Sequence, residues 1–120
     1  LPSAQIKNKA GDFVAASLES VSAAAAASVS TMPEDLRVQI TNADGNGAYP
    51  ISSYTYILVY KDQTDAGKGK AISDFLWWAL HDGEKFVKEL HYSPLPAEVI
   101  KKVEGKISSL TNSGKPLRQQ

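Results

Sequence analysis

The stretch from Tyr54 to Tyr60 constrains the fold more than any other part of this 120-residue chain. It reads Tyr-Thr-Tyr-Ile-Leu-Val-Tyr, and its density of β-branched and aromatic residues predicts a β-strand. Apolar side chains fall on both faces of that strand. We therefore expect it to be buried inside a sheet that carries helices on its two sides, which is an α/β architecture.

The N-terminal half predicts one helix, one strand and one turn. Ser17 or Ser20 can cap a helix that contains the alanine run Ala23–Ala27, and we expect that run to be a closely packed helix face. The segment 37–41 alternates polar and apolar residues as a half-buried strand does. The segment 42–47, which is rich in Asn, Asp and Gly, predicts a turn.

The C-terminal half predicts three helices. A loop over residues 62–70 precedes the first, which we expect to stop at Gly83 in the left-handed conformation. A shorter helix is expected around residues 86–90, and the last helix should start near Pro96. The polar tail from Asn112 to Gln120 is expected to be frayed. The first helix carries an apolar stripe at helical spacing, formed by Ile72, Phe75, Leu76, Ala79 and Leu80.

Composition excludes several classes of function. Thirteen Lys and Arg balance thirteen Asp and Glu, so the net charge of zero offers no electrostatic argument for nucleic acid or an anionic membrane. The absence of Cys excludes disulfides, thiolate metal sites and cysteine nucleophiles. The longest apolar run, Ala23–Ala27, is far shorter than the roughly 20 residues that a membrane-spanning helix needs.

Two local patterns imitate ligand loops. The segment 42–47 resembles the opening of a calcium-binding EF-hand loop, but the twelfth position of that loop would be Ser53 instead of Glu. The glycines and lysines of segment 67–70 lack the spacing of a nucleotide-binding phosphate loop. We interpret the first segment as a plain turn and the second as a solvated loop.

No constellation predicts catalysis or a metal site. His81 and His91 are ten residues apart, which is the wrong spacing for a shared metal, and each is expected to cap or pack at a helix end. Trp77 and Trp78 point about 100° apart on a helix, and one of them is expected to be wedged between helix and sheet instead of stacking on a ligand. The solvated face of the last helix is expected to carry Lys101, Lys102 and Lys106.

Several motifs follow one another along the chain in a recognisable order, at residues 6–11 and 17–21, 49–59, 61–63, 75–79, 90–96 and 113–117. This order resembles one known family, the PstS-type periplasmic phosphate-binding proteins, which are the solute receptors of phosphate ABC transporters. The resemblance extends over essentially the whole chain and corresponds to the C-terminal part of the family.

The resemblance implies a non-enzymatic, two-lobed binding protein of the type II periplasmic fold, with no cofactor. Residues 1–48 would end the second lobe, 49–53 would cross between the lobes, and 54–120 would complete the first lobe. The implied ligand is inorganic phosphate, the implied partner is a membrane ABC permease, and the implied location is the periplasm or another extracytoplasmic space. Closure is expected to bend near Pro50 and Ser52.

The family's phosphate ligands lie upstream of this chain, so the resemblance assigns no ligand-binding residue here. It therefore transfers no phosphate contact to Arg37, Asp44, Ser52 or Ser53. An unpaired strand at 54–60 is expected to associate with the missing N-terminal part or with a second copy of the chain. The alternative function is an interaction or assembly module that keeps the fold elements and binds no anion.

Overall fold

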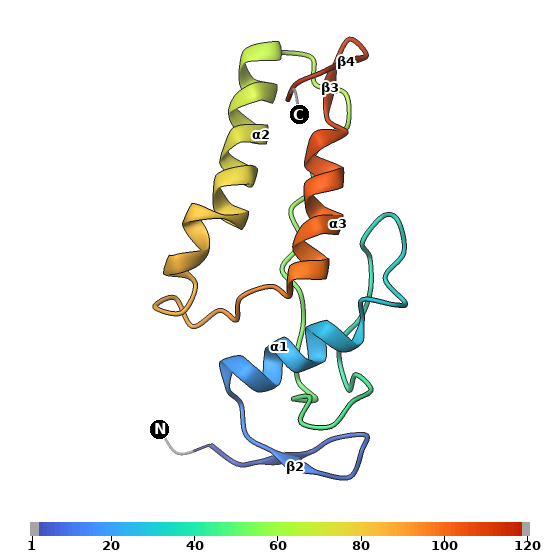
Figure 1. The fold of residues 1–120 in the computed structure, drawn as a ribbon, viewed down its shortest axis with the longest axis vertical. Helices are drawn as coiled ribbons and strands as arrows, with labels where there is room; N and C mark the ends of the chain where they lie inside the picture. The colour runs from blue at the N-terminus through green and yellow to red at the C-terminus, as the bar shows by residue number, and fades with distance from the viewer. Residues whose placement is uncertain (1–2, 119–120) are drawn as a thin grey trace.

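The computed structural model describes residues 3–118, which combine helices with two short antiparallel hairpins (Figure 1). This mixture agrees with the α/β prediction at the coarse level. In chain order the elements are β1 (Ile6–Lys7), β2 (Phe13–Val14), α1 (Leu18–Ala27), α2 (Ala66–Leu80), the 3-10 helix η1 (Asp82–Phe86), α3 (Ala97–Ser108), β3 (Thr111–Asn112) and β4 (Lys115–Pro116).

Helix α1 forms as its sequence predicts. Ser17 is the cap, because its hydroxyl accepts from the Ser20 amide at 3.1 Å while the Ser20 hydroxyl accepts from the Ser17 amide at 2.9 Å. Ala24 and Ala25 are buried, which confirms the closely packed alanine face. After α1, the predicted turn at 42–47 forms. The segment 37–41 alternates in burial up to Ile40, but it forms no β-ladder and is not a strand.

Helices α2 and α3 lie side by side and run in opposite directions (Figure 1). Helix α2 begins earlier than expected, because the Asp65 carboxylate accepts from the Lys68 amide at 2.9 Å and so satisfies a free N–H of the first turn. The predicted loop 62–70 is therefore wrong beyond Asp65, and Gly67 and Gly69 lie within the helix.

The connection between α2 and α3 also differs from expectation. Helix α2 ends at Leu80 with His81 as its cap residue, and Gly83 lies buried in η1 against the Trp78 ring without a positive φ. The left-handed stop at Gly83 was thus a wrong prediction. The shorter helix predicted at 86–90 is wrong as well, since η1 ends at Phe86 and turns follow it.

The C-terminal end is more ordered than the sequence suggested. Helix α3 starts directly after Pro96, as predicted, and buries Val99 and Ile107. The first part of the tail that follows is not frayed, because β3 and β4 form a hairpin. Leu117, just after β4, lies so close to α2 that a Cβ added at Gly69 would clash with its side chain. Residues 119–120 of the tail lie outside the described residues.

The segment from Tyr54 to Tyr60 is the largest departure from prediction. It runs lengthwise past α3 without pairing in a β-ladder (Figure 1), and Ile57, Leu58 and Tyr60 are 66%, 96% and 85% exposed. The expected buried strand is therefore wrong for this chain. The physical reason is that no second strand among residues 3–118 lies beside the segment to take up its backbone hydrogen bonds.

The molecule is consequently open and elongated, measuring 50 × 29 × 20 Å. Its radius of gyration is 16.5 Å, against about 14 Å for a compact domain of this length. Its accessible surface is 8340 Å², whereas a compact monomer of 12.9 kDa exposes about 6300 Å². The excess of about 2000 Å² is comparable to one side of a large, obligate protein interface.

Candidate functional site

An open apolar groove of about 860 Å³ occupies the side of the molecule where the unpaired segment runs. The segment Tyr54–Val59 forms one wall. The other walls are apolar positions of α2 and α3, namely Leu76, Ala79, Leu80, Val99, Val103 and Ile107. Two helices and one extended strand segment thus surround a space that the described residues leave unfilled.

Tyrosine side chains hold the segment in place instead of a β-ladder. The Tyr56 hydroxyl accepts from the Val38 amide at 3.1 Å and donates to the Val38 carbonyl at 2.7 Å. The Tyr54 hydroxyl donates to the Ala25 carbonyl at 3.2 Å. Only at its far end does the segment meet a strand, where the Thr111 amide donates to the Lys61 carbonyl at 2.8 Å. Between these anchors the Tyr60 carbonyl accepts from the Gln63 side chain, whereas the backbone of residues 57–59 makes no backbone hydrogen bond within residues 3–118.

The predicted crossing at residues 49–53 lies against α1 and against the end of segment 37–42. The Tyr49 amide donates to the Ser20 carbonyl at 3.0 Å, and the Asn42 amide donates to the Pro50 carbonyl at 2.8 Å. Ser52 is buried, and its hydroxyl donates to the Tyr49 carbonyl at 2.8 Å. These contacts give the crossing a defined path past α1.

The turn at 42–47 has the geometry of an ordinary Asx/Gly turn. Gly45 and Gly47 adopt positive φ values of 123° and 73°, which explains why glycine stands there. Asp44, the carboxylate that an EF-hand loop would use, instead pairs with Lys9 at 2.6 Å. Within residues 3–118 no three His, Asp or Glu side chains gather in a way that could hold a metal ion.

The polar residues considered as phosphate contacts are engaged elsewhere. The Arg37 guanidinium pairs with Asp35 at 2.7 Å, and its hydrogen bonds to that carboxyl hold the pKa of Asp35 below its usual value. The Ser53 hydroxyl donates to the neighbouring Tyr54 carbonyl at 3.2 Å. These side chains do not converge on one point that could take an anion.

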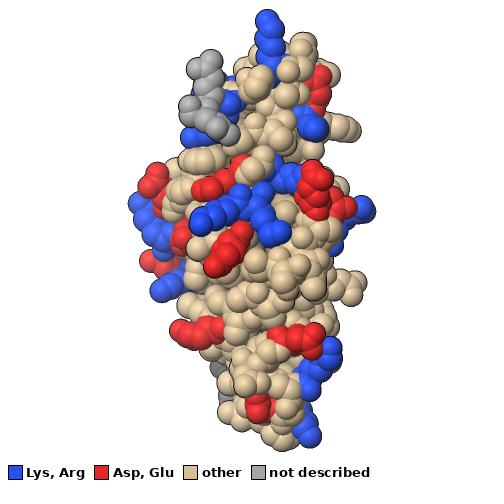
Figure 2. Space-filling view, turned by 45° about the vertical axis from the view of Figure 1, so that its right-hand side comes forward, with Lys and Arg blue, Asp and Glu red and all other residues tan. Residues whose placement is uncertain are grey.

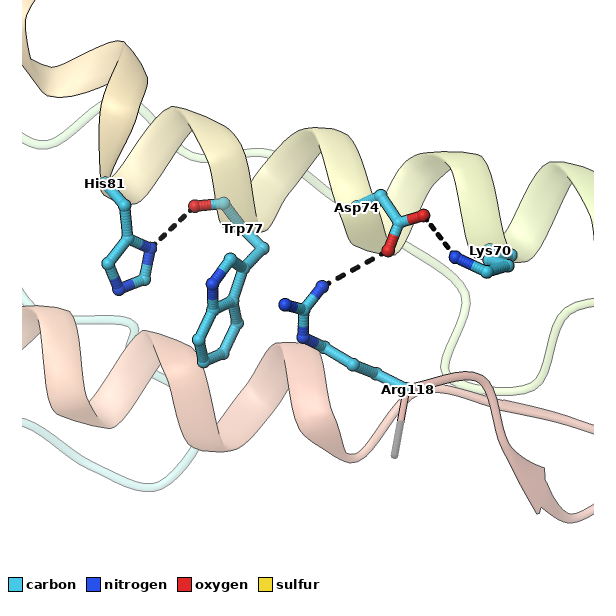
Figure 3. Close-up of polar contacts among 5 residues, drawn as sticks. All are labelled: Lys70, Asp74, Trp77, His81 and Arg118. Atoms are coloured by element: carbon cyan, nitrogen blue, oxygen red, sulfur yellow. Dashed lines mark hydrogen bonds and ion pairs between the residues drawn. The ribbon is translucent and has the colours of Figure 1, made fainter. Parts of the chain in front are cut away.

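A stacked cluster joins α2, α3 and the C-terminal end (Figure 3). The Trp77 ring stacks on His81 at 4.7 Å between centroids, and the Arg118 guanidinium lies 4.1 Å from the Trp77 centroid. Arg118 also pairs with Asp74 at 3.2 Å. The expected wedge of a tryptophan between helix and sheet is wrong, because Trp77 stacks between His81 and Arg118, and Trp78 is 44% exposed beside Phe75 and Phe86.

The pKa of His81 is raised by its neighbours in this cluster. Its Nδ1 lies 2.7 Å from the Trp77 carbonyl and its Nε2 lies 2.9 Å from the Glu104 carboxylate. Two acceptors can both be satisfied only by the doubly protonated ring, so the Trp77 carbonyl and then Glu104 raise the pKa of His81. The prediction that His81 caps and packs at a helix end is confirmed. The contributions of Glu104 and Arg118 were not predicted, because no local pattern brings them to α2.

Charge on the surface is mixed. Figure 2 shows blue and red side chains next to one another across the middle of the face it presents. On α3, Lys106 pairs with Glu34 at 3.1 Å while Lys101 is exposed, in agreement with a solvated helix face. No helix in the part of the chain that the structure describes is long and apolar enough to cross a membrane.

Comparison with known proteins relates most of the chain to phosphate-binding proteins of one kind. A phosphate-binding protein PstS of Xylella fastidiosa is 41% identical over 99 residues, which is 82% of this chain and 27% of the relative. PstS of Pasteurella multocida is 37% identical over 118 residues, or 97% of this chain and 34% of the relative. PstS of Methanocaldococcus jannaschii is 37% identical over 116 residues. No family model matches the chain.

The chain corresponds to one segment of the PstS phosphate-binding proteins. The predicted resemblance is thereby confirmed. The chain spans only 27–34% of the length of the curated relatives it matches. A PstS segment of this size leaves most of each relative's length without a counterpart, which agrees with the unfilled groove and the large exposed surface.

Proposed function

We propose that this chain is the C-terminal portion of a two-lobed phosphate-binding protein that captures phosphate outside the cytoplasm and delivers it to a membrane ABC permease. The observation that carries the proposal is the match to PstS proteins over up to 97% of the chain, at a third of their length. Binding and delivery are non-enzymatic, and no cofactor takes part.

Residues 54–120 complete the first lobe in this proposal. The support is physical: α2 and α3 form a helical layer, and the Tyr54–Tyr60 segment lies along it with an unpaired backbone and exposed apolar side chains. Strands from the rest of the protein that pair with this segment would fill the groove and bury Ile57 and Leu58. The segment would then become the interior strand that its composition predicts.

Residues 1–48 end the second lobe, and residues 49–53 cross between the lobes. The hydrogen bonds of Tyr49 and Pro50 support this reading, because they hold residues 49–53 beside α1, between the turn at 42–47 and the segment that begins at Tyr54. Hinge bending near Pro50 and Ser52 remains a prediction. Replacing both residues in the full-length protein should change phosphate affinity or closure, and unchanged values of both would remove the hinge assignment.

Phosphate contacts come from the rest of the protein. Arg37, Asp44, Ser52 and Ser53 have partners within this chain, so none is assigned to the anion. Titration calorimetry should detect phosphate binding by the full-length protein and none by residues 1–120 alone. Micromolar phosphate binding by residues 1–120 would overturn this assignment. A full-length protein that does not bind phosphate would overturn the proposed function.

The alternative is an assembly module without anion binding, and the exposed groove is the observation that favours it. Sedimentation of residues 1–120 with and without the remaining part of the protein distinguishes the two. Formation of a one-to-one complex that binds phosphate supports the receptor. A stable complex that never binds phosphate supports the assembly module, whereas a compact, partner-free monomer contradicts both.

A further inference from the structure

Helix α1 lies in the N-terminal half of the chain, but some of its distant hydrogen bonds reach the C-terminal half. In the first half of the helix, the Ser93 hydroxyl donates to the Leu18 carbonyl at 2.6 Å. That leaves the Ser22 hydroxyl to donate toward the Ser93 oxygen at 2.7 Å and the Pro94 carbonyl at 3.1 Å. The turn before α3 is thus fastened to the first turns of α1.

A second attachment holds the other end of the helix. The Tyr54 hydroxyl donates to the Ala25 carbonyl at 3.2 Å and lies 3.0 Å from the Ser28 hydroxyl. Ser28 also donates to the Ala25 carbonyl at 2.8 Å. Burial raises the pKa of the Tyr54 hydroxyl, which agrees with a phenol enclosed at a packed contact.

Packing between these attachments is close. Ala24 has no exposed surface and Ala25 is 4% exposed, so the small side chains let neighbouring backbone approach the helix. Towards the β1–β2 hairpin, by contrast, the side-chain bonds of the helix start are local: Ser20 donates to the Ala15 carbonyl at 2.8 Å. In the described residues, every hydrogen bond that joins α1 to a distant segment ends between residues 49 and 94.

We propose that α1 is fastened to the first lobe by the Ser22–Ser93 hydroxyl pair and by Tyr54, and that it moves with residues 54–120 when the lobes close. The motion then bends the chain between β2 and α1, at residues 15–17, as well as at the crossing. The proposal rests on the proposed two-lobed receptor, and it assigns α1 to the first lobe instead of the second.

The absence of Cys makes this measurable with pairs of spin labels in the full-length protein, after any native cysteines outside this segment are replaced. One pair joins Ala26→Cys on α1 to Lys101→Cys on α3, and the matched pair joins Ala10→Cys at the β1–β2 turn to Lys101→Cys; all three positions are exposed. On adding inorganic phosphate, the first distance should stay constant and the second should change. A first distance that changes as much as the second would overturn the proposal.

Hydrogen exchange tests the attachment without relying on phosphate. Ser93→Ala in the full-length protein should speed amide exchange in α1 about two- to tenfold, the effect of losing one or two neutral hydrogen bonds, and leave α2 unchanged. Ser109→Ala is the control, because that hydroxyl donates only within α3, to the Lys106 carbonyl. Unchanged α1 exchange in Ser93→Ala would overturn the attachment. If phosphate moves neither label pair but Ser93→Ala frees α1, the receptor function fails while the attachment stands.

Discussion

The α2–α3 layer and the segment 54–60 are both rich in apolar residues, but only the layer buries some of its apolar side chains fully within the chain. Val99 and Ile107 are 3% and 4% exposed, whereas Leu58 on the neighbouring segment is 96% exposed. A helix satisfies its own backbone hydrogen bonds, so two helices need only pack against each other. A strand needs a second strand, and none lies beside this one among residues 3–118.

Leu58→Asp should give the largest difference in unfolding free energy between residues 1–120 and the full-length protein. In residues 1–120 alone the side chain is already in water, so the unfolding free energy should change by no more than about 0.5 kcal/mol. In the full-length protein the same substitution places a carboxylate in a buried sheet and should cost more than about 3 kcal/mol. Denaturant unfolding of both chains measures this, with exposed Ser30→Asp as the control. Equal effects in the two chains would show that the segment stays exposed.

Ile107→Ala tests the region that is already packed. The side chain is 4% exposed on α3, and truncating it should cost about 2–5 kcal/mol in residues 1–120 as well as in the full-length protein. Thermal or denaturant unfolding gives the value. A substantial cost in the full-length protein alone would mean that the α2–α3 layer does not form without the rest of the protein.

Two glycines within helices provide a finer test of packing in the α2–α3 layer. Gly105 on α3 has nothing within 4 Å of an added Cβ, so Gly105→Ala should stabilise residues 1–120 by about 0.5–1 kcal/mol. At Gly69 on α2, an added Cβ would lie 2.8 Å from the Leu117 side chain and 2.9 Å from Gln63. Gly69→Ala should therefore stabilise residues 1–120 less than Gly105→Ala does, or should destabilise them. An equal gain at both positions would show that the C-terminal end does not pack on α2.

The pH dependence of stability gives the smallest expected effect. The pKa of His81 is raised in the folded chain, so its contribution is fully present below the unfolded pKa of about 6.5 and is lost as pH rises through the higher folded value. The groups facing the ring are the Trp77 carbonyl, Glu104 and Asp82. His81→Gln should flatten the stability profile between pH 6 and 8 when measured by denaturant unfolding. An unchanged slope would assign the dependence to other groups.

Local chemistry made several elements predictable. The Ser17 cap, the start of α3 after Pro96 and the turn at 42–47 depend on residues a few positions apart, so the sequence is sufficient. The start of α2 differs from the prediction because the Asp65 carboxylate caps the helix even though Gly67 and Gly69 follow it, two residues that usually favour a loop. The cluster of Trp77, His81 and Arg118 is not predictable from the sequence. Glu104 and Arg118 come to the end of α2 only because α2, α3 and the tail pack together.

The sequence by itself determined the relation of this chain to PstS proteins and the positions of α1 and α3, because ordered motifs, caps and apolar periodicity are properties of the chain alone. The tertiary structure decided where α1 is attached and that the strand segment has no neighbour. The reason is physical: side-chain periodicity is a property of the chain, whereas a β-ladder and a hydroxyl contact between Ser22 and Ser93 exist only when distant backbone arrives at the right place.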